Sequence, residues 1–245
     1  KEMIGIIDWR LAELERLGVE VRYNIYAEAE DVLALGPEVV VIATGGLPQA
    51  PEMDGENLTT SSWDITTGEV KAAGRVLVYD DGGAHAGMTA AEVAARAGAE
   101  VELVTPERFF APDMGGMNHV PYMRAFHETG TKVTINTRLL GVRREGNELV
   151  ATFGSDFAPG WSEERRADRV VVEHGTRPLD ELYFALKPQS RNLGAVDYTA
   201  LRTSGPLFPS RNGEGRFDLY RIGDAVAARN IHAGIYDALR MGIRW

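Results

Sequence analysis

The stretch Arg75–Val104 reads RVLVYDDGGAHAGMTAAEVAARAGAEVELV, and it decides the fold that we expect. It opens with an apolar strand over 75–80, turns through the glycine-rich segment Asp81–Gly87 and continues as a helix of small residues over 88–97. A second strand, with alternating polar and apolar positions, begins at Glu100. A strand, a glycine turn, a helix and a strand within about 30 residues form a βαβ unit, which should cross right-handed into a parallel pair.

The glycine turn is the strongest local functional signal of the chain. A tight turn from a strand into a helix presents backbone N–H groups that favour a phosphate, and glycines let the backbone approach a pyrophosphate. Gly83 and Gly87 match outer members of the pattern G-x-G-x-x-G, but His85 replaces a glycine where the backbone would meet the ligand. Asp80 and Asp81 also bring negative charge to this place. Two interpretations stay open: a nucleotide site, and a turn that keeps its glycines for helix–strand packing.

Two further strands end in residues that suit a ligand. The segment Val39–Gly46 is apolar on both faces, as a central parallel strand is, and closes with Thr44-Gly45-Gly46. The segment Leu219–Asp224 stops at a glycine–acid pair, and a helix follows near Asn230. Ligands of open α/β sheets bind at the carboxyl ends of strands. Asp224 is therefore a candidate acceptor for sugar or ribityl hydroxyl groups, and the helix start suits a phosphate. The alternative, that Asp224 only caps its turn, stays open.

The remaining elements follow from hydrophobic periodicity and from the positions of glycine and proline. We expect helices over 4–17, 29–35, 120–129 and 231–241. We expect strands over 19–24, 132–135, 139–144, 149–153 and 169–174, a turn at 145–147 and a loop over 205–215. Because strands and helices alternate along much of the chain, the sequence predicts an α/β fold.

Composition excludes several classes of function. The 245 residues carry 26 basic and 36 acidic side chains, a net charge of -10, which disfavours a nucleic-acid or anionic-membrane surface. The chain has no cysteine, which excludes disulfides, a thiolate zinc site, a catalytic cysteine and a cysteine-ligated iron–sulfur cluster within it. The histidines show no metal-ligand spacing, so we assign no metal. No apolar run reaches the roughly 20 residues of a membrane span and no signal peptide opens the chain, so we expect a cytoplasmic protein.

The order of the motifs is more specific than any one of them. An Ala-Thr-Gly-Gly strand end, a linker, the glycine-turn βαβ unit, Gly175-Thr-Arg-Pro178 and Ile222-Gly-Asp-Ala225 follow one another. This order resembles the C-terminal half of the trimethylamine dehydrogenase, 2,4-dienoyl-CoA reductase and NADH:flavin oxidoreductase family. Tyr220–Ala225 together with Arg229–His232, and the segment Leu77–Gly87, resemble the N-methylproline (stachydrine-type) demethylases in particular. The resemblance covers nearly the whole chain.

The resemblance implies two Rossmann-like, three-layer domains of the FAD/NAD(P)-binding type, with the second inserted in the first. The first domain would comprise 1–63 and 205–245 and bind FAD or ADP, and 64–204 would form the NAD(P)-binding-type domain. A first βαβ unit, and a TIM barrel with FMN, the catalytic residues and a 4Fe–4S cluster, would precede Lys1. The chain would thus be a truncated C-terminal region without catalytic residues of its own. That barrel and an electron-transferring flavoprotein are the implied partners, and a homo-oligomer stays open.

The resemblance also assigns residues by position. The ADP portion of FAD or ADP itself would lie near Thr44, Gly45 and Gly46. Gly223 and Asp224 would face the ribityl or pyrophosphate region, with Ile231 and His232 at the helix start. An NAD(P)-type site would be lined by Gly82, Gly83 and Gly87, although His85 and the neighbouring acids depart from the pattern and place NAD(P)H binding in doubt.

Three functions compete at this point. The first is the nucleotide-binding region of a flavin-dependent oxidoreductase, an amine dehydrogenase, N-demethylase or enoate-reductase-like enzyme. This chain alone would then be inactive. The second is a stand-alone NAD(P)H-binding reductase module, and the third a structural domain whose nucleotide sites have decayed. The first depends on Thr44-Gly45 and Gly223-Asp224 meeting around one cofactor.

Overall fold

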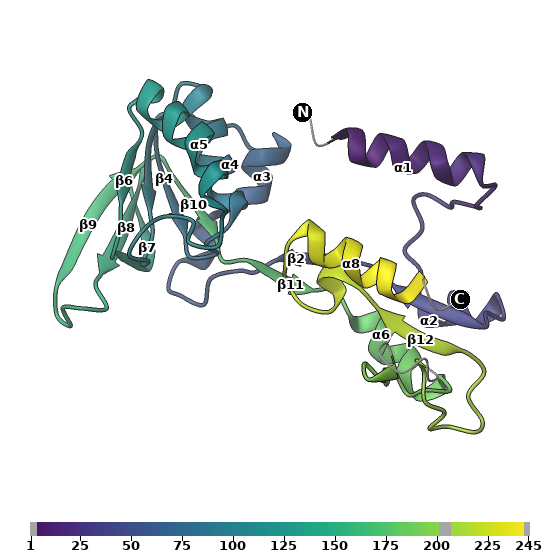
Figure 1. The fold of residues 1–245 in the computed structure, drawn as a ribbon. Coiled ribbons are helices and arrows are strands. Elements are labelled where there is room, and N and C mark those ends of the chain that lie inside the picture. The colour runs from purple at the N-terminus through teal and green to yellow at the C-terminus, as the bar shows by residue number, and fades with distance from the viewer. Residues whose placement is uncertain (1–3, 201–206, 243–245) are drawn as a thin grey trace. The chain divides into compact units, whose positions relative to one another are not determined.

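The computed structural model describes residues 4–200 and 207–242 (Figure 1). The chain divides into two compact units, each made of two stretches. The first unit consists of Lys1–Ile42 and Glu181–Tyr220, and the second of Ala43–Asp180 and Arg221–Trp245. These bounds differ from those expected for the two nucleotide-binding domains, whose boundary at 204/205 lies outside the described residues. The bounds and the insertion of those domains stay a prediction.

A five-stranded parallel sheet forms the centre of the second unit. Its strands, in spatial order, are β3 (Thr60–Ser61), β10 (Arg169–Glu173), β4 (Arg75–Asp80), β5 (Glu100–Val104) and β6 (Lys132–Thr134). β4, the helix α4 (His85–Arg96) and β5 form the predicted βαβ unit, and Val76 pairs with Val101 across its parallel strands. The expected α/β fold with a parallel sheet is therefore confirmed.

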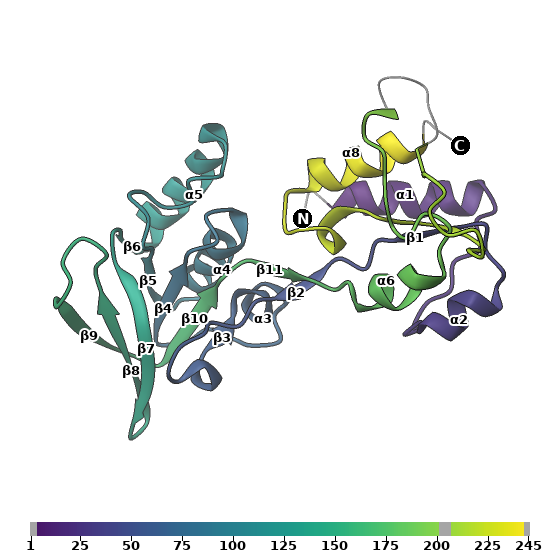
Figure 2. The ribbon, with the colours of Figure 1, turned by 90° about the horizontal axis from the view of Figure 1, so that it is seen from below.

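The two faces of this sheet bury different partners, because successive side chains of a strand point to opposite sides. Val76 and Val78 of β4 pack on one side with the helices α3 (Ser62–Thr67), α4 and α5 (Gly116–Thr129). Leu77 and Tyr79 pack on the other side with an antiparallel sheet. That sheet consists of β7 (Arg138–Glu145), β8 (Glu148–Gly154) and β9 (Ser162–Ala167) (Figure 2).

The predicted turn at 145–147 joins β7 to β8, but the sequence did not predict β9. β9 reads Ser-Glu-Glu-Arg-Arg-Ala and has no apolar alternation. Its charges instead pair across β8 with side chains of β7, as Glu164 does with Arg143 at 2.8 Å and Arg166 with Glu145 at 2.6 Å. Opposite charges across strands stabilise a sheet modestly. Because these charges stabilise β9 only beside its partner strands, the sequence of 162–167 alone does not indicate a strand.

The second unit also contains a two-stranded sheet and the C-terminal helix. In the sheet, β2 (Gly46–Pro48) pairs antiparallel with β11 (Thr176–Pro178), and the helix is α8 (Ile231–Gly242). The unit also contains the 3-10 turns η1 (Glu56–Leu58) and η3 (Gly223–Ala225).

The first unit is built around the strand pair β1–β12. It contains α1 (Ile4–Arg16), α2 (Ala29–Ala34), β1 (Val39–Ile42), α6 (Glu181–Leu186), the 3-10 turn η2 (Lys187–Gln189) and β12 (Asp218–Arg221). The N–H of Asp218 donates to the carbonyl of Glu38 at 2.9 Å, where both strands begin, so the two strands run in the same direction. The strand expected over 19–24 is wrong: the segment is exposed coil, with Asn24 in the left-handed region at φ 58°.

The side chain of Asn192 completes the hydrogen bonding of β12. Its amide donates to the carbonyl of Leu219 at 2.8 Å, and its Oδ1 accepts from the N–H of Leu219 at 2.9 Å. The amide also donates to the carbonyl of Ala195 at 2.9 Å. Asn192 and Leu219 are both fully buried, so this one side chain satisfies both backbone groups of a residue that water does not reach.

Among the described residues, no helix is long and apolar enough to cross a membrane.

Replacing Asn192 by Ala should lower the free energy of unfolding by roughly 2–4 kcal/mol, because each buried polar group left unpaired costs about 1–3 kcal/mol. Asn118→Ala, at an exposed position of α5, is the matched control and should change stability by less than about 0.5 kcal/mol. Urea unfolding of the three proteins measures this. Equal stability of Asn192→Ala and the unchanged chain would contradict the role assigned to Asn192.

Candidate functional site

The segment Leu179-Asp180 contacts the ends of both strands that carry the ligand-type residues. Thr44, just beyond β1, donates its hydroxyl to the carbonyl of Leu179, and the N–H of Leu179 donates to the carbonyl of Gly45 at 3.0 Å. Arg221, the last residue of β12, donates to the carboxylate of Asp180 at 2.6 Å. β1 and β12 are neighbours in one sheet. The structure thus brings the two predicted strand ends together.

Gly45 and Gly46 are glycines for different reasons. A Cβ on Gly46 would lie 2.3 Å from Cγ2 of Thr176 and 2.5 Å from the carbonyl oxygen of Arg177, so the pairing of β2 with β11 requires a glycine there. Gly45 has φ +72°, and among the described residues no heavy atom lies within 4 Å of an added Cβ. The backbone at Gly45 is therefore open to a ligand, whereas Gly46 is closed by its own sheet.

Gly223 is fixed from two sides. Its N–H donates to Oδ2 of Asp237 at 3.1 Å, and its carbonyl accepts from the guanidinium of Arg229 at 3.2 Å. Arg229 and Asp237 also form an ion pair. Gly223 has φ +61°, and a Cβ there would lie 3.9 Å from Cα of Gly234 on α8. The left-handed backbone conformation favours glycine at this position, whereas the distance to α8 would be an ordinary van der Waals contact.

Sequence reasoning did not find Asp237, although a signal was present. Asp237 is an acid among the apolar positions of α8 and is only 4% exposed. Burial alone would raise the pKa of its carboxyl. The hydrogen bonds from Arg229, Arg240 and the N–H of Gly223 outweigh burial and lower that pKa below its usual range. Asp237 is therefore a charged anchor for the turn that precedes α8.

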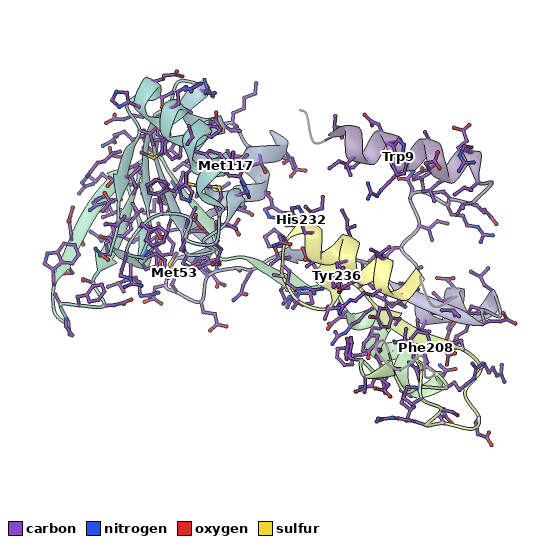
Figure 3. The ribbon with its side chains drawn as sticks, in the orientation of Figure 1. Trp9, Met53, Met117, Phe208, His232 and Tyr236 are labelled. Atoms are coloured by element: carbon purple, nitrogen blue, oxygen red, sulfur yellow. The ribbon has the colours of Figure 1, made fainter. Side chains whose placement is uncertain are left out.

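Asp224 uses one carboxylate oxygen inside its own turn. Its Oδ1 accepts from the N–H of Arg229 at 3.1 Å, as the capping alternative requires. Asn230 caps α8, because its Oδ1 accepts from a backbone N–H three residues on, at 3.0 Å. Ile231 and His232 are the first two residues of α8 and are exposed; Figure 3 shows His232 at this helix start. The predicted residues of the first site therefore lie on β2, η3 and α8 and the coil before them, and β11 lies against η3.

The glycine turn after β4 is a separate place, and the carboxylate of Asp80 fills it. The N–H groups of Gly82 and Gly83 both donate to Oδ1 of Asp80, at 3.0 and 3.2 Å. A Cβ on Gly87 would lie 2.5 Å from Cγ of Asp80, so that carboxyl group packs directly on the first turn of α4. Asp80 is 1% exposed.

The surroundings of Asp80 raise its pKa. Burial, the largest cause, brings the pKa of this carboxyl to about 7, although the N–H groups of Gly83 and Gly82 lower it. The charge of Glu173, at the end of β10, raises it further. Glu173 itself accepts from the hydroxyl of Ser62 and from the N–H of Gly175 at 2.8 Å. Acidic side chains thus occupy the carboxyl ends of the adjacent strands β4 and β10.

Metal binding finds no support in the described part of the chain, where no group of three or more His, Asp or Glu side chains is arranged to hold an ion.

Comparison with known proteins identifies relatives along the whole chain. Residues 9–206 match the family described as "Pyridine nucleotide-disulphide oxidoreductase". The chain is 52% identical over 242 residues to "Probable N-methylproline demethylase" of Rhizobium meliloti (strain 1021), covering 98% of this chain and 36% of the relative. It is 40% identical over 252 residues to "N,N-dimethylglycine/sarcosine dehydrogenase" of Chromohalobacter salexigens, with the same coverage. The predicted resemblance is confirmed, and the chain spans about a third of the length of these relatives.

The fold is also shared with solved structures. The structure of 6-hydroxypseudooxynicotine amine oxidase from Pseudomonas geniculata N1 has a TM-score of 0.76 at 23% sequence identity, covering 99% of this chain and 34% of the other. At this identity the likeness shows a common fold.

Asp237→Asn should lower the free energy of unfolding at pH 7 by about 3–5 kcal/mol, because it removes one member of a buried charged group. The contribution of Asp237 is present above the ordinary Asp pKa near 4 and is lost as pH falls through its lowered pKa, so the two proteins should converge in acid. Urea unfolding at several pH values tests this. Glu92→Gln, whose pair with Arg96 is partly solvent-exposed, is the control and should cost less than about 1 kcal/mol. A loss that does not depend on pH would contradict the charge argument.

Asp80 should make the protein less stable as pH rises from about 4 to about 7, because the folded state binds a proton that the unfolded chain has released. A tenfold difference in the ionisation constant corresponds to about 1.4 kcal/mol. Asp80→Asn should remove this slope, so its stability relative to the unchanged chain should improve between pH 4 and pH 8. Asp8→Asn, at an exposed position of α1, should leave the slope in place. Identical pH profiles for Asp80→Asn and the unchanged chain would refute the assignment.

Proposed function

The chain belongs to the pyridine nucleotide-disulphide oxidoreductase family, and we propose that it is the nucleotide-binding region of a flavin-dependent oxidoreductase. The cofactor is FAD or ADP, bound where the ends of β1 and β12 meet. The chain does not itself carry the reacting groups. The observation that supports this proposal most directly is the joint attachment of both strand ends to Leu179-Asp180.

The residues present at the two strand ends fit such a ligand. Gly45 offers open backbone, which lets a flat or phosphorylated group approach. One carboxylate oxygen of Asp224 accepts a hydrogen bond from the N–H of Arg229, and its second oxygen could accept one from a hydroxyl group of the ligand. The first turn of α8, with Ile231 and His232, adds the N–H groups of a helix start, which favour a phosphate. In this proposal the ADP portion lies by Thr44, Gly45 and Gly46, and Gly223 and Asp224 face its ribityl or pyrophosphate end.

The domain organisation of the proposal is that of two Rossmann-like domains, with 64–204 inserted between 1–63 and 205–245. A barrel that holds FMN and a 4Fe–4S cluster would supply the reaction centre outside this chain. The absence of cysteine from all 245 residues supports this assignment of the cluster. In sequence, Leu179-Asp180 lies between the proposed stretches 1–63 and 205–245. It contacts Thr44 and Gly45 of the first stretch and Arg221 of the second, which favours a first domain assembled from both.

The substrate class follows from the relatives. Two of them are named for N-methylproline and for N,N-dimethylglycine and sarcosine, which are amino acids with methylated nitrogen. We therefore assign to the intact enzyme the oxidation of a small N-methyl amino acid. The FMN bound in the barrel would accept the hydride that such an amine loses on oxidation. The proposed partners are the barrel and an electron-transferring flavoprotein that takes up the electrons.

Asp224→Ala in the holoprotein should reduce bound ADP or FAD roughly tenfold or more, because a hydrogen bond to a charged group contributes about 1.5–3 kcal/mol and 1.4 kcal/mol is a factor of about ten. Nucleotide released by heating the purified protein, separated by chromatography, measures the content. Asp156→Ala is the control: this acid pairs with Arg138 at the antiparallel sheet of the second unit, and its loss should leave the content unchanged. Full nucleotide content in a folded Asp224→Ala protein would overturn the proposed site.

A further inference from the structure

The turn Asp81–Gly87 has the chain path of a phosphate site, but its donors are already engaged. In such a site the N–H groups of the glycines point at the phosphate oxygens. Here the N–H groups of Gly82 and Gly83 point at one oxygen of Asp80. Asp80 is the last residue of β4, so the strand that leads into the turn also supplies the group that occupies it.

The space of the turn is filled as well as its hydrogen bonds. An added Cβ on Gly87 would lie 2.5 Å from Cγ and 2.7 Å from Oδ2 of Asp80, so the carboxyl group rests on the backbone where α4 begins. An added Cβ on Gly82 would lie 3.2 Å from Oε1 of Glu173 and 3.4 Å from Oδ1 of Asp80. The glycines of the motif therefore make room for the chain's own carboxylates.

The outer side of the turn is covered by the segment that follows β5. The N–H of Asp113 donates to the carbonyl of Gly83 at 2.9 Å, and a Cβ on Gly83 would lie 3.2 Å from Cγ of Pro112. Ala111 and Met114, on either side of this pair, are 1% and 6% exposed and belong to the core of the helix-covered face. Packing thus holds this cover in place.

We propose that Asp80 closes the second glycine turn to the pyrophosphate of a dinucleotide, so that this turn binds no NAD(P). An entering phosphate would have to displace the carboxyl group from both N–H groups and would meet Glu173 beside it. Opposite charge is what favours phosphate at a helix start, and here the nearest side-chain groups are acidic. This inference does not depend on a ligand at Gly45 and Asp224, because it concerns a different turn.

The test reads the amide resonances of Gly82 and Gly83 in ¹⁵N-labelled chain while inorganic pyrophosphate, and separately NADH, is added to millimolar concentration. The unchanged chain should show no shift of these two resonances. Asp80→Asn is the matched control, because its amide oxygen and volume keep the turn occupied, and it should also show none. Asp80→Ala frees both N–H groups and should show saturable shifts with pyrophosphate. Asp80→Ser, which loses less polar contact, replaces it if Asp80→Ala does not fold.

Shifts of Gly82 and Gly83 in the unchanged chain would overturn the proposal, since the turn would then be open. A folded Asp80→Ala or Asp80→Ser chain that leaves both resonances in place would overturn it too, since Asp80 would not be what closes the turn. Failure of the first nucleotide site would be seen separately, as absence of ADP or FAD from the holoprotein.

Discussion

The contacts of Leu179-Asp180 hold together parts of the chain that lie far apart in sequence. This short segment follows β11, accepts from Thr44, donates to Gly45 and pairs with Arg221. Thr44 and Leu179 are 135 residues apart, and bringing such distant residues together costs conformational entropy. The folded elements between them must therefore offset this cost. β11 follows β10 after only two residues, so Leu179-Asp180 lies close in sequence to the parallel sheet of the second unit.

Glycines in this chain have two separate structural roles, and a glycine-rich sequence motif alone does not distinguish them. Gly46 and Gly87 lack a side chain because other parts of the protein approach to within 2.3–2.5 Å of where a Cβ would be. Gly45 has a left-handed backbone with open space beside it. Only the second kind can admit a ligand without rearrangement. This explains why two glycine-rich strand ends in one chain differ, with an open one after β1 and one filled by Asp80 after β4.

The local elements could be predicted from sequence because periodicity and turn residues encode them directly. The βαβ unit of Arg75–Val104 and the hairpin at 145–147 appear where the sequence indicates them. Features that depend on distant partners could not be predicted. The charges of β9 pair with side chains of β7 and β8. The segment 19–24 has strand-like alternation but no strand to pair with among the described residues. Asp237 acquires its role only when α8 meets Gly223. For the candidate site, the sequence predicted which residues are at strand ends, but not which of those ends is open.

Photolabelling with 8-azido-ADP tests the central claim most directly, because it reports which of the two glycine turns accepts an adenine nucleotide. The intact enzyme that contains this chain is illuminated with the probe and digested, and the labelled peptides are mapped, with excess ADP as competitor. Our account predicts competed label on peptides that contain 44–46 or 223–232, and none on the peptide that contains 82–87. Competed label on the 82–87 peptide, or none on the peptides of the two strand ends, would contradict it.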